Sequence, residues 1–184
     1  EVMCISSSKS SPKDNIFLYD ELASRKLNFN ADFILHLASI NSNLTETEIH
    51  QEIDLLRKVI SSMKTLNCIN IIFFSSIKVY GENSFNFSVI DENAIQNPEC
   101  FYGKAKAKCE RLLKDLSQEM KFNYLIFRMP PVLINDPKSN VGKLFQLVEK
   151  GIPILSFAVG DKNQRSFLSY DFLVYVLKII LKKG

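Results

Sequence analysis

Tyr102 and Lys106 are the two side chains of this sequence whose types and spacing best suit proton transfer. In a helix, residues four positions apart lie on one face, so the phenol and the ammonium come within reach of each other. A free tyrosine has a pKa of about 10, and a nearby ammonium favours the phenolate and lowers that pKa. The pair therefore predicts a general acid or base, although a Tyr-x-x-x-Lys spacing alone more often marks a half-buried ring beside a solvated charge.

A hydroxyl partner for Tyr102 lies upstream, where the apolar run 71–74 ends in Ser75 and Ser76. Such a run is typical of a parallel strand that is buried on both faces. In open α/β sheets the ligand crevice lies beyond the carboxyl ends of the strands. Ser76 is therefore expected to hold the substrate oxygen that Tyr102 protonates or deprotonates. Together with Lys106, these side chains would interconvert an alcohol and a ketone.

The elements that must position these side chains alternate between strands and helices. Short apolar runs predict strands, and apolar residues at helical spacing predict helices. Strands are expected at 2–5, 16–19, 32–37, 71–76, 124–127 and 167–168, and helices over 45–64, 102–121, 141–150 and 172–182. This alternation indicates βαβ units around a parallel sheet, and hence an α/β fold.

Composition limits the classes of protein to which the chain can belong. Its 184 residues are enough for one domain with a sizeable core, and 46% hydrophobic with 23% charged residues is ordinary for a soluble globular protein. A net charge of +3 is too mild to indicate nucleic-acid binding. No apolar run reaches the roughly 18 residues of a membrane span. The four cysteines show no metal-ligand spacing, which predicts reduced thiols in a cytoplasmic protein without a metal site.

Five segments, in order along nearly the whole chain, resemble a known family. The segments are 31–39, 74–82, 98–106, 127–132 and 164–167. Together they resemble the extended short-chain dehydrogenase/reductase family, in its NAD-dependent nucleotide-sugar epimerase/dehydratase branch, and are most similar to UDP-glucose 4-epimerase-like proteins. The resemblance implies a Rossmann-like doubly wound parallel sheet. Residues 1–128 would form the dinucleotide-binding domain, and residues 129–184 would be part of the substrate-binding region.

The resemblance also implies roles for particular residues. Tyr102, Lys106 and Ser76 would be catalytic, and Lys106 would also hold the nicotinamide ribose. The NAD-binding residues would be Asp20, Ala38, Ser39, Ser75, Tyr102 and Lys106, and the UDP-sugar would contact Ser76, Arg165 and Asn140. The implied reaction is the epimerisation of a UDP-hexose at C4 through a 4-keto sugar, as part of surface-polysaccharide biosynthesis.

Several of these residues have a second interpretation. Asp20 and Asn140 could cap the helices that follow them, and Arg165 could form a surface salt bridge with Asp171. His36 is expected to be a packed strand residue rather than a base. The apolar side chains of helix 102–121 would suit either a homodimer interface or packing on the sheet; they are Leu112, Leu113 and Leu116.

The sequence departs from the family pattern at positions that matter for the cofactor. A dinucleotide-binding unit needs a loop of the form G-x-G-x-x-G, whereas the first glycine here is Gly81. The sheet is therefore expected to be truncated at its first strand, and the substrate-binding part to be truncated as well. We interpret the sequence as a truncated form or fragment of a longer enzyme, with a degenerate relative that no longer binds nucleotide as the alternative. Residues 51–56 replace an Asn and a Gly-Thr pair that usually contact the cofactor, and Cys100 stands where a hydroxyl residue is usual.

Three functions compete at this point. The first is an NAD-dependent nucleotide-sugar epimerase, and the second is a 4-keto nucleotide-sugar reductase of the same family. Dehydration is disfavoured, because dehydratases usually carry carboxylates at the positions that Ile77 and Lys78 occupy. The third is a non-catalytic binding or partner module, which the absence of the glycine loop favours and the presence of Ser76, Tyr102 and Lys106 disfavours.

Overall fold

The computed structural model describes residues 4–6, 16–18, 30–37, 39, 45–81, 89–134, 139–153 and 166–183. Its elements in chain order are β1 (Cys4–Ser6), β2 (Ile16–Leu18), β3 (Ile34–His36), α2 (Glu48–Thr65), β4 (Asn70–Ser76), the 3-10 helix η1 (Ile77–Tyr80), α3 (Phe101–Met120), β5 (Asn123–Met129), β6 (Val132–Leu133), α4 (Asn140–Glu149), β7 (Leu168–Ser169) and α5 (Tyr170–Lys183). All the strand pairs in this part of the chain are parallel. The α/β fold with a parallel sheet is therefore confirmed.

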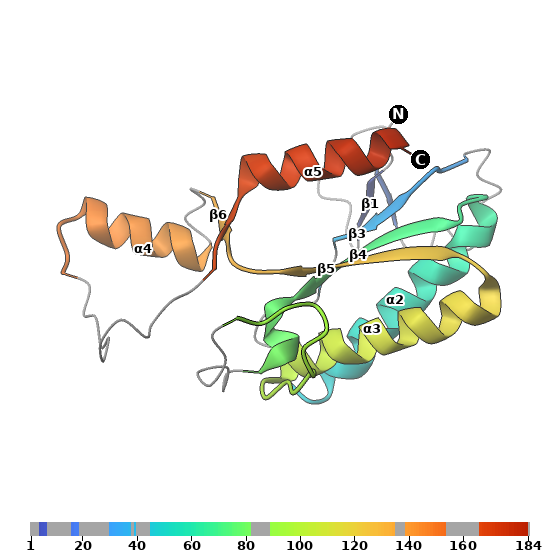
Figure 1. The fold of residues 1–184 in the computed structure, drawn as a ribbon, viewed down its shortest axis with the longest axis horizontal. Helices are drawn as coiled ribbons and strands as arrows, with labels where there is room; N and C mark the ends of the chain where they lie inside the picture. Colours follow the sequence, from blue (N-terminus) through green and yellow to red (C-terminus); the bar gives the residue numbers. More distant parts are fainter. Residues whose placement is uncertain are drawn as a thin grey trace.

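The sheet that positions the site has three strands in the order β3-β4-β5. β4 lies in the middle, and its residues 71–76 are all buried. The apolar run is therefore a central strand covered on both sides, as its composition predicts. Ser75 pairs with Arg128 and Ser76 with Met129, so β4 and β5 end together at the same edge of the sheet (Figure 1).

Two amphipathic helices, α2 and α3, cover one face of this sheet (Figure 1). From α2, Leu56 and Ile60 point into the core, and Cys109 and Leu113 from α3 join the same cluster at a spacing of four residues. Phe73 of β4 belongs to this cluster and is completely buried. The removal of this apolar surface from water stabilises the packing of both helices on the sheet.

The leucines of α3 contribute to this core. Leu113 has no exposed surface, and Leu112 and Leu116 are partly buried against the same cluster. The sequence left open whether these side chains pack on the sheet or form a homodimer interface. Packing within the chain is what the structure shows, and a homodimer through this helix stays a prediction.

The first turn of α3 packs closely on η1, the short helix that follows Ser76. Gly103 permits this approach, because a Cβ at its position would lie 2.5 Å from the carbonyl oxygen of Lys78. Cys100 is the N-cap of α3, and its Sγ accepts a hydrogen bond from the Gly103 amide at 3.4 Å. Cys100 therefore performs a capping task for which hydroxyl side chains are usual.

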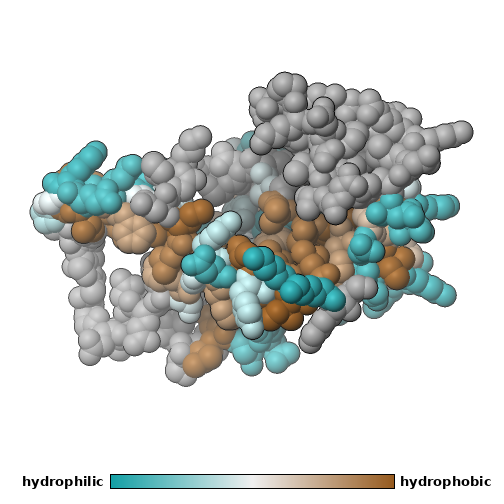
Figure 2. Space-filling view, turned by 90° about the horizontal axis from the view of Figure 1, so that it is seen from above, coloured by the Kyte–Doolittle hydropathy of each residue, from teal (hydrophilic) through white to brown (hydrophobic). Residues whose placement is uncertain are grey.

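After β5 the chain leaves the three-stranded sheet. β6 pairs with β7, α4 lies away from the sheet, and α5 lies on the side opposite α2 and α3 (Figure 1). Large apolar side chains remain exposed on α4 and α5, among them Phe145, Val148, Phe172 and Tyr175, and hydrophobic surface is visible from above in Figure 2.

None of the described helices is long and apolar enough to cross a membrane. The division of the chain after residue 128 stays a prediction.

Candidate active site

The carboxyl end of β4 carries the two serines that the sequence singles out. Ser76 is the N-cap of η1, where its Oγ accepts a hydrogen bond from the Lys78 amide at 3.2 Å. The hydroxyl proton of Ser76 is not used in that bond, so it can be donated to another oxygen. Ser75 is buried and donates its hydroxyl proton to Glu110 of α3. Ser76 thus suits the predicted substrate contact, while the Ser75 side chain serves to tie β4 to α3.

Tyr102 and Lys106 lie one turn apart on α3, and their side chains meet as the spacing predicts. The Nζ atom of Lys106 lies 5.8 Å from the centre of the Tyr102 ring and 5.0 Å from the centre of the Phe73 ring. The Tyr102 hydroxyl is hydrogen-bonded to the side chain of Ser39, which follows β3. Strand ends and the first turns of α3 therefore bring together Tyr102, Lys106 and Ser39 at one edge of the sheet.

Lys106 has a partner that the sequence analysis did not anticipate. Its Nζ donates a hydrogen bond of 2.8 Å to Oε1 of Glu52 on α2, and both side chains are 1% exposed. Glu52 occupies an inward position, three residues after buried Ile49 and four before buried Leu56. An acidic residue in the middle of an apolar helix face is the sequence signal that could have revealed this pair.

The pKa of Tyr102 is raised above its usual range, which corrects the expectation that Lys106 lowers it. Burial is the largest cause, because it disfavours the charged phenolate, and the nearby carboxylate of Glu52 adds to the effect. The hydrogen bond from Ser39 acts in the opposite direction. The expectation treated Lys106 as an isolated cation, whereas its charge is paired with Glu52 in the folded chain.

His36 lies at the end of β3, and its ring packs on Phe73, on the face of the sheet that α2 and α3 cover. It is 3% exposed and stacks on Phe73 with 5.6 Å between ring centres. Burial and then the charge of Lys106 lower its pKa to about 4, so the imidazole is neutral near pH 7. His36 is therefore a packed strand residue, as expected. Its Nε2 has no hydrogen-bond partner among the residues that the structure describes.

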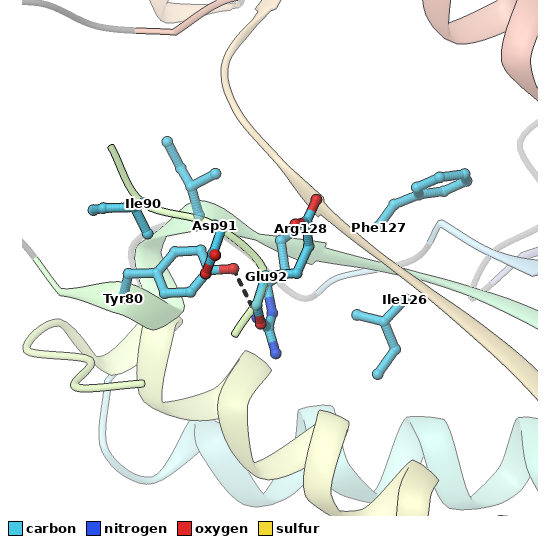
Figure 3. Close-up of a pocket in the computed structure, with 8 residues that line it drawn as sticks. Tyr80, Ile90, Asp91, Glu92, Ile126, Phe127 and Arg128 are labelled. Carbon is cyan, nitrogen blue, oxygen red and sulfur yellow. Dashed lines mark hydrogen bonds between the residues drawn. The ribbon is translucent and has the colours of Figure 1, made fainter. Parts of the chain in front are cut away.

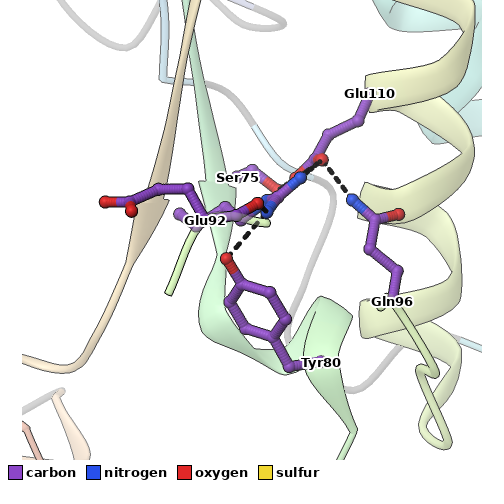
Figure 4. Close-up of polar contacts among 6 residues, drawn as sticks. Ser75, Tyr80, Glu92, Gln96 and Glu110 are labelled. Atoms are coloured by element: carbon purple, nitrogen blue, oxygen red, sulfur yellow. Dashed lines mark hydrogen bonds and ion pairs between the residues drawn. The ribbon is translucent and has the colours of Figure 1, made fainter. Parts of the chain in front are cut away.

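A second polar cluster centres on Glu110 and Arg128, which the sequence analysis also missed. Glu110 accepts hydrogen bonds from Ser75, from Gln96 and from two nitrogens of the Arg128 guanidinium, Nε and Nη2, which make three contacts with its carboxylate. Arg128 also donates to the Tyr80 hydroxyl at 2.7 Å and to the Glu92 carbonyl oxygen at 2.8 Å. Figure 4 shows how these contacts join α3, η1 and the segment before α3.

The cluster has a clear physical effect on Arg128. Hydrogen bonds to Glu110 raise the pKa of Arg128 above its usual range, and the bond to Tyr80 adds to that effect against the opposing cost of burial. The guanidinium also lies 5.0 Å from the centre of the Tyr80 ring. Glu110 follows Lys106 by four residues on one face of α3, and this continued spacing is the signal by which it could have been found.

A cavity lies beside this cluster, next to the end of β4 and β5. It has a volume of about 420 Å³ and is lined by Ile77, Tyr80, Ile90, Asp91, Glu92, Ile126, Phe127 and Arg128. Figure 3 shows the side chains of η1, β5 and the segment before α3 around it. Its position at the carboxyl ends of parallel strands is where ligands bind in open α/β sheets. No group of three or more His, Cys, Asp or Glu in the described part of the chain could hold a metal ion.

Several predicted site residues lie outside the described part of the chain. They are Asp20, Ala38 and Arg165, and their roles stay predictions. Asn140 begins α4, but its side chain is not described. The suggestion that Asn140 caps this helix is wrong, because the N-cap is Ser139, whose Oγ accepts a hydrogen bond of 2.8 Å from the Gly142 amide. A contact between Asn140 and the nucleotide stays a prediction.

Comparison with known proteins identifies relatives of this chain. The sequence model of the NAD dependent epimerase/dehydratase family matches residues 15–181. A UDP-glucose 4-epimerase from Vibrio cholerae is 38% identical over 108 residues, which are 56% of this chain and 31% of that protein. The chain therefore spans about a third of the length of that relative.

Solved structures share the fold. A UDP-glucose 4-epimerase from Thermotoga maritima, solved with UDP-glucose, has a TM-score of 0.74 at 19% identity, over 93% of this chain and 62% of that chain. A UDP-glucuronic acid 4-epimerase from Bacillus cereus, solved with NAD, has a TM-score of 0.72 at 19% identity, over 93% of this chain and 57% of that chain. At this level of identity the likeness establishes the Rossmann-type fold that the sequence predicts.

Proposed function

Because this chain belongs to the NAD dependent epimerase/dehydratase family, we propose that it serves the NAD-dependent epimerisation of a UDP-hexose at C4. The observation that carries the proposal is the meeting of Tyr102, Lys106 and Ser39 on one edge of the sheet, beside the strand end that carries Ser76. Tyr102, Lys106 and Ser76 are the predicted acid/base set, and Ser39 is one of the predicted NAD-binding residues. The UDP-glucose 4-epimerase from Vibrio cholerae, which is 38% identical over 108 residues, supports a UDP-hexose as the substrate class.

In this proposal Tyr102 exchanges a proton with the sugar hydroxyl. Ser76 donates its free hydroxyl proton to the same oxygen and so orients the sugar. NAD supplies reversible two-electron oxidation of the sugar carbon when it is bound. Ser39 and Tyr102 would hold its nicotinamide half, and their position at the carboxyl edge of the sheet fits that task. The Lys106 ammonium is 1% exposed and bonded to Glu52, so its contact with the nicotinamide ribose stays a prediction.

The cavity beside Arg128 is where we place part of the substrate. It borders η1, which Ser76 caps, and its volume of about 420 Å³ suits a small ligand. The Arg128 guanidinium is hydrogen-bonded to Glu110 and Tyr80. We therefore propose that Arg128 stabilises the wall of the cavity. The UDP diphosphate would then be held by other groups, of which Arg165 stays the predicted one.

A second function is favoured by one observation. Burial and then Glu52 raise the pKa of Tyr102 and so disfavour the phenolate that would act as a base, whereas the protonated phenol is the form that donates a proton to a ketone. A 4-keto nucleotide-sugar reductase needs only that direction of transfer, whereas an epimerase needs both. The reductase is therefore retained as the alternative.

Calorimetry with NAD, with and without UDP-glucose, tests the proposal directly. We expect NAD to bind, and UDP-glucose to bind more tightly once NAD is present. Conversion of UDP-glucose to UDP-galactose by the same sample would support the epimerase, and its loss in Tyr102→Phe would assign the proton exchange. A folded sample that binds neither ligand would refute the proposal for this chain.

A further inference from the structure

The buried ion pair between Glu52 and Lys106 has no assigned role in the proposed reaction. We propose that Glu52 is a positioning residue of this site, whose carboxylate holds the Lys106 ammonium beneath the Tyr102 ring and so sets the charge that the Tyr102 phenol faces. This inference deepens the proposed function and rests on it only for its catalytic meaning. The contact itself is the 2.8 Å hydrogen bond between Nζ and Oε1.

The burial of both side chains makes this contact strong enough to decide where Lys106 points. Both are 1% exposed, so neither charge is compensated by water. Removing one member of a buried pair is strongly destabilising, because the other charge is left unpaired. Lys106 is therefore expected to stay against Glu52, and the rings of Phe73 and Tyr102 at 5.0 and 5.8 Å confine it further.

The pair also changes what Tyr102 experiences. A lysine without a counterion would stabilise the phenolate, whereas a carboxylate bonded to that lysine offsets its charge and itself disfavours the phenolate. The carboxylate of Glu52 raises the pKa of Tyr102 in addition to the effect of burial. Glu52 comes from α2 and Lys106 from α3, so the docking of two helices sets the proton affinity of the tyrosine.

Other titratable and hydrogen-bonding groups also lie around this pair. They come from β3, the segment that follows β3, the N-cap of α3 and α3 itself: His36, Ser39, Cys100, Cys109 and Glu110. The pKa of His36 is lowered to about 4 and that of Cys109 is raised to about 12, so both are neutral near pH 7. Ser39 lowers the pKa of Tyr102 and Cys100 raises it only as the smallest cause. Glu52 is therefore the main charged group that acts on the phenol.

Titration of the Tyr102 phenol tests the inference without any ligand. The absorbance of tyrosinate near 295 nm is followed against pH, and the contribution of Tyr102 is isolated by subtracting the curve of Tyr102→Phe in each background. The rise in absorbance as the Tyr102 phenol ionises is called the Tyr102 step, and in the wild type it is not expected below about pH 10. In Glu52→Gln we expect the Tyr102 step to move down by about one pH unit or more, which is about a tenfold gain in phenolate at a given pH.

Matched variants separate this effect from general changes in charge or stability. Asp54→Asn removes one negative charge from the exposed face of the same helix, and it is expected to leave the step in place. Glu52→Asp keeps the carboxylate and is expected to keep the step high. If Glu52→Gln does not fold, Glu52→Gln with Lys106→Met leaves no unpaired buried charge, and its Tyr102 step is also expected below that of the wild type.

A folded Glu52→Gln or double variant whose Tyr102 step coincides with that of the wild type would overturn the inference. This outcome is distinct from a failure of the proposed function, which is read from the binding of NAD and UDP-glucose. If NAD binds and the step does not move, only the role of Glu52 is lost. If the step moves and no ligand binds, the role of Glu52 in setting the protonation of Tyr102 holds and the enzymatic assignment fails.

Discussion

Replacement of Glu110 by Gln is expected to destabilise the edge of the sheet where the candidate site lies. Glu110 is 5% exposed and Arg128 is 21% exposed, and their closest contact is 2.8 Å. The change keeps the shape of the side chain but removes the charge that faces Arg128. Its amide group can still accept a hydrogen bond from Ser75, so the electrostatic contact with Arg128 is the main loss.

The size of the effect follows from this burial. Breaking a fully buried pair costs about 3–5 kcal/mol, and the partial exposure of Arg128 reduces the expected loss to about 2–3 kcal/mol. For a chain of this size, about 1 kcal/mol lowers the melting temperature by about 2–4 °C. We therefore expect Glu110→Gln to lower it by about 4–12 °C.

Thermal unfolding followed by circular dichroism measures this change, with urea unfolding as a second measurement. Glu119→Gln is the matched control, because Glu119 lies on the exposed surface of the same helix and should change stability by less than about 0.5 kcal/mol. Arg128→Met and the double variant complete a cycle, in which we expect a coupling of about 1–2 kcal/mol. A coupling near zero, or a Glu110→Gln variant as stable as the control, would refute the assignment of this cluster as a structural tie.

Two further predictions concern the same edge of the sheet. His36 has its pKa lowered to about 4 by burial and by Lys106, so the unfolded chain binds the proton more readily and wild-type stability should fall as the pH decreases from about 6.5 to about 4. His36→Gln should lose less stability over this range. Equal urea midpoints for the two proteins at both ends of the range would show that His36 does not cause the loss of stability. Gly103→Ala should lower stability by about 1–3 kcal/mol, because its Cβ would lie 2.5 Å from the Lys78 carbonyl oxygen. Lys108→Ala on the exposed side of α3 is the control. A Gly103→Ala variant with the same melting temperature as this control would show that η1 can move away from α3 without loss of stability.

Much of the fold was predictable because local sequence patterns are strong here. The run at 71–74 is apolar without interruption, which is typical of a central parallel strand, and it lies in β4. Helical spacing placed α2 and α3 to within a few residues. Boundaries differ slightly, since capping residues such as Cys100 and Ser139 decide where a helix begins.

The candidate site was predictable only in part. The spacing of Tyr102 and Lys106 determined that they share a face of α3, and the end of the apolar run determined that Ser76 lies at the sheet edge. Contacts between distant segments were not predictable, because no local pattern states which side chain of α2 faces which side chain of α3. Glu52 and Lys106 are 54 positions apart, and their pairing required both helices to dock on β4.

The amino-acid sequence by itself determined the α/β class, the central strand and the shared helix face of Tyr102 and Lys106. Each of these depends on periodicity or spacing within a short segment, where the geometry of a helix or strand leaves few choices. Only the tertiary structure decided the charge environment of Tyr102. A pKa depends on burial and on charges within a few ångströms, and helix docking brings Glu52 to Lys106 and removes both from water.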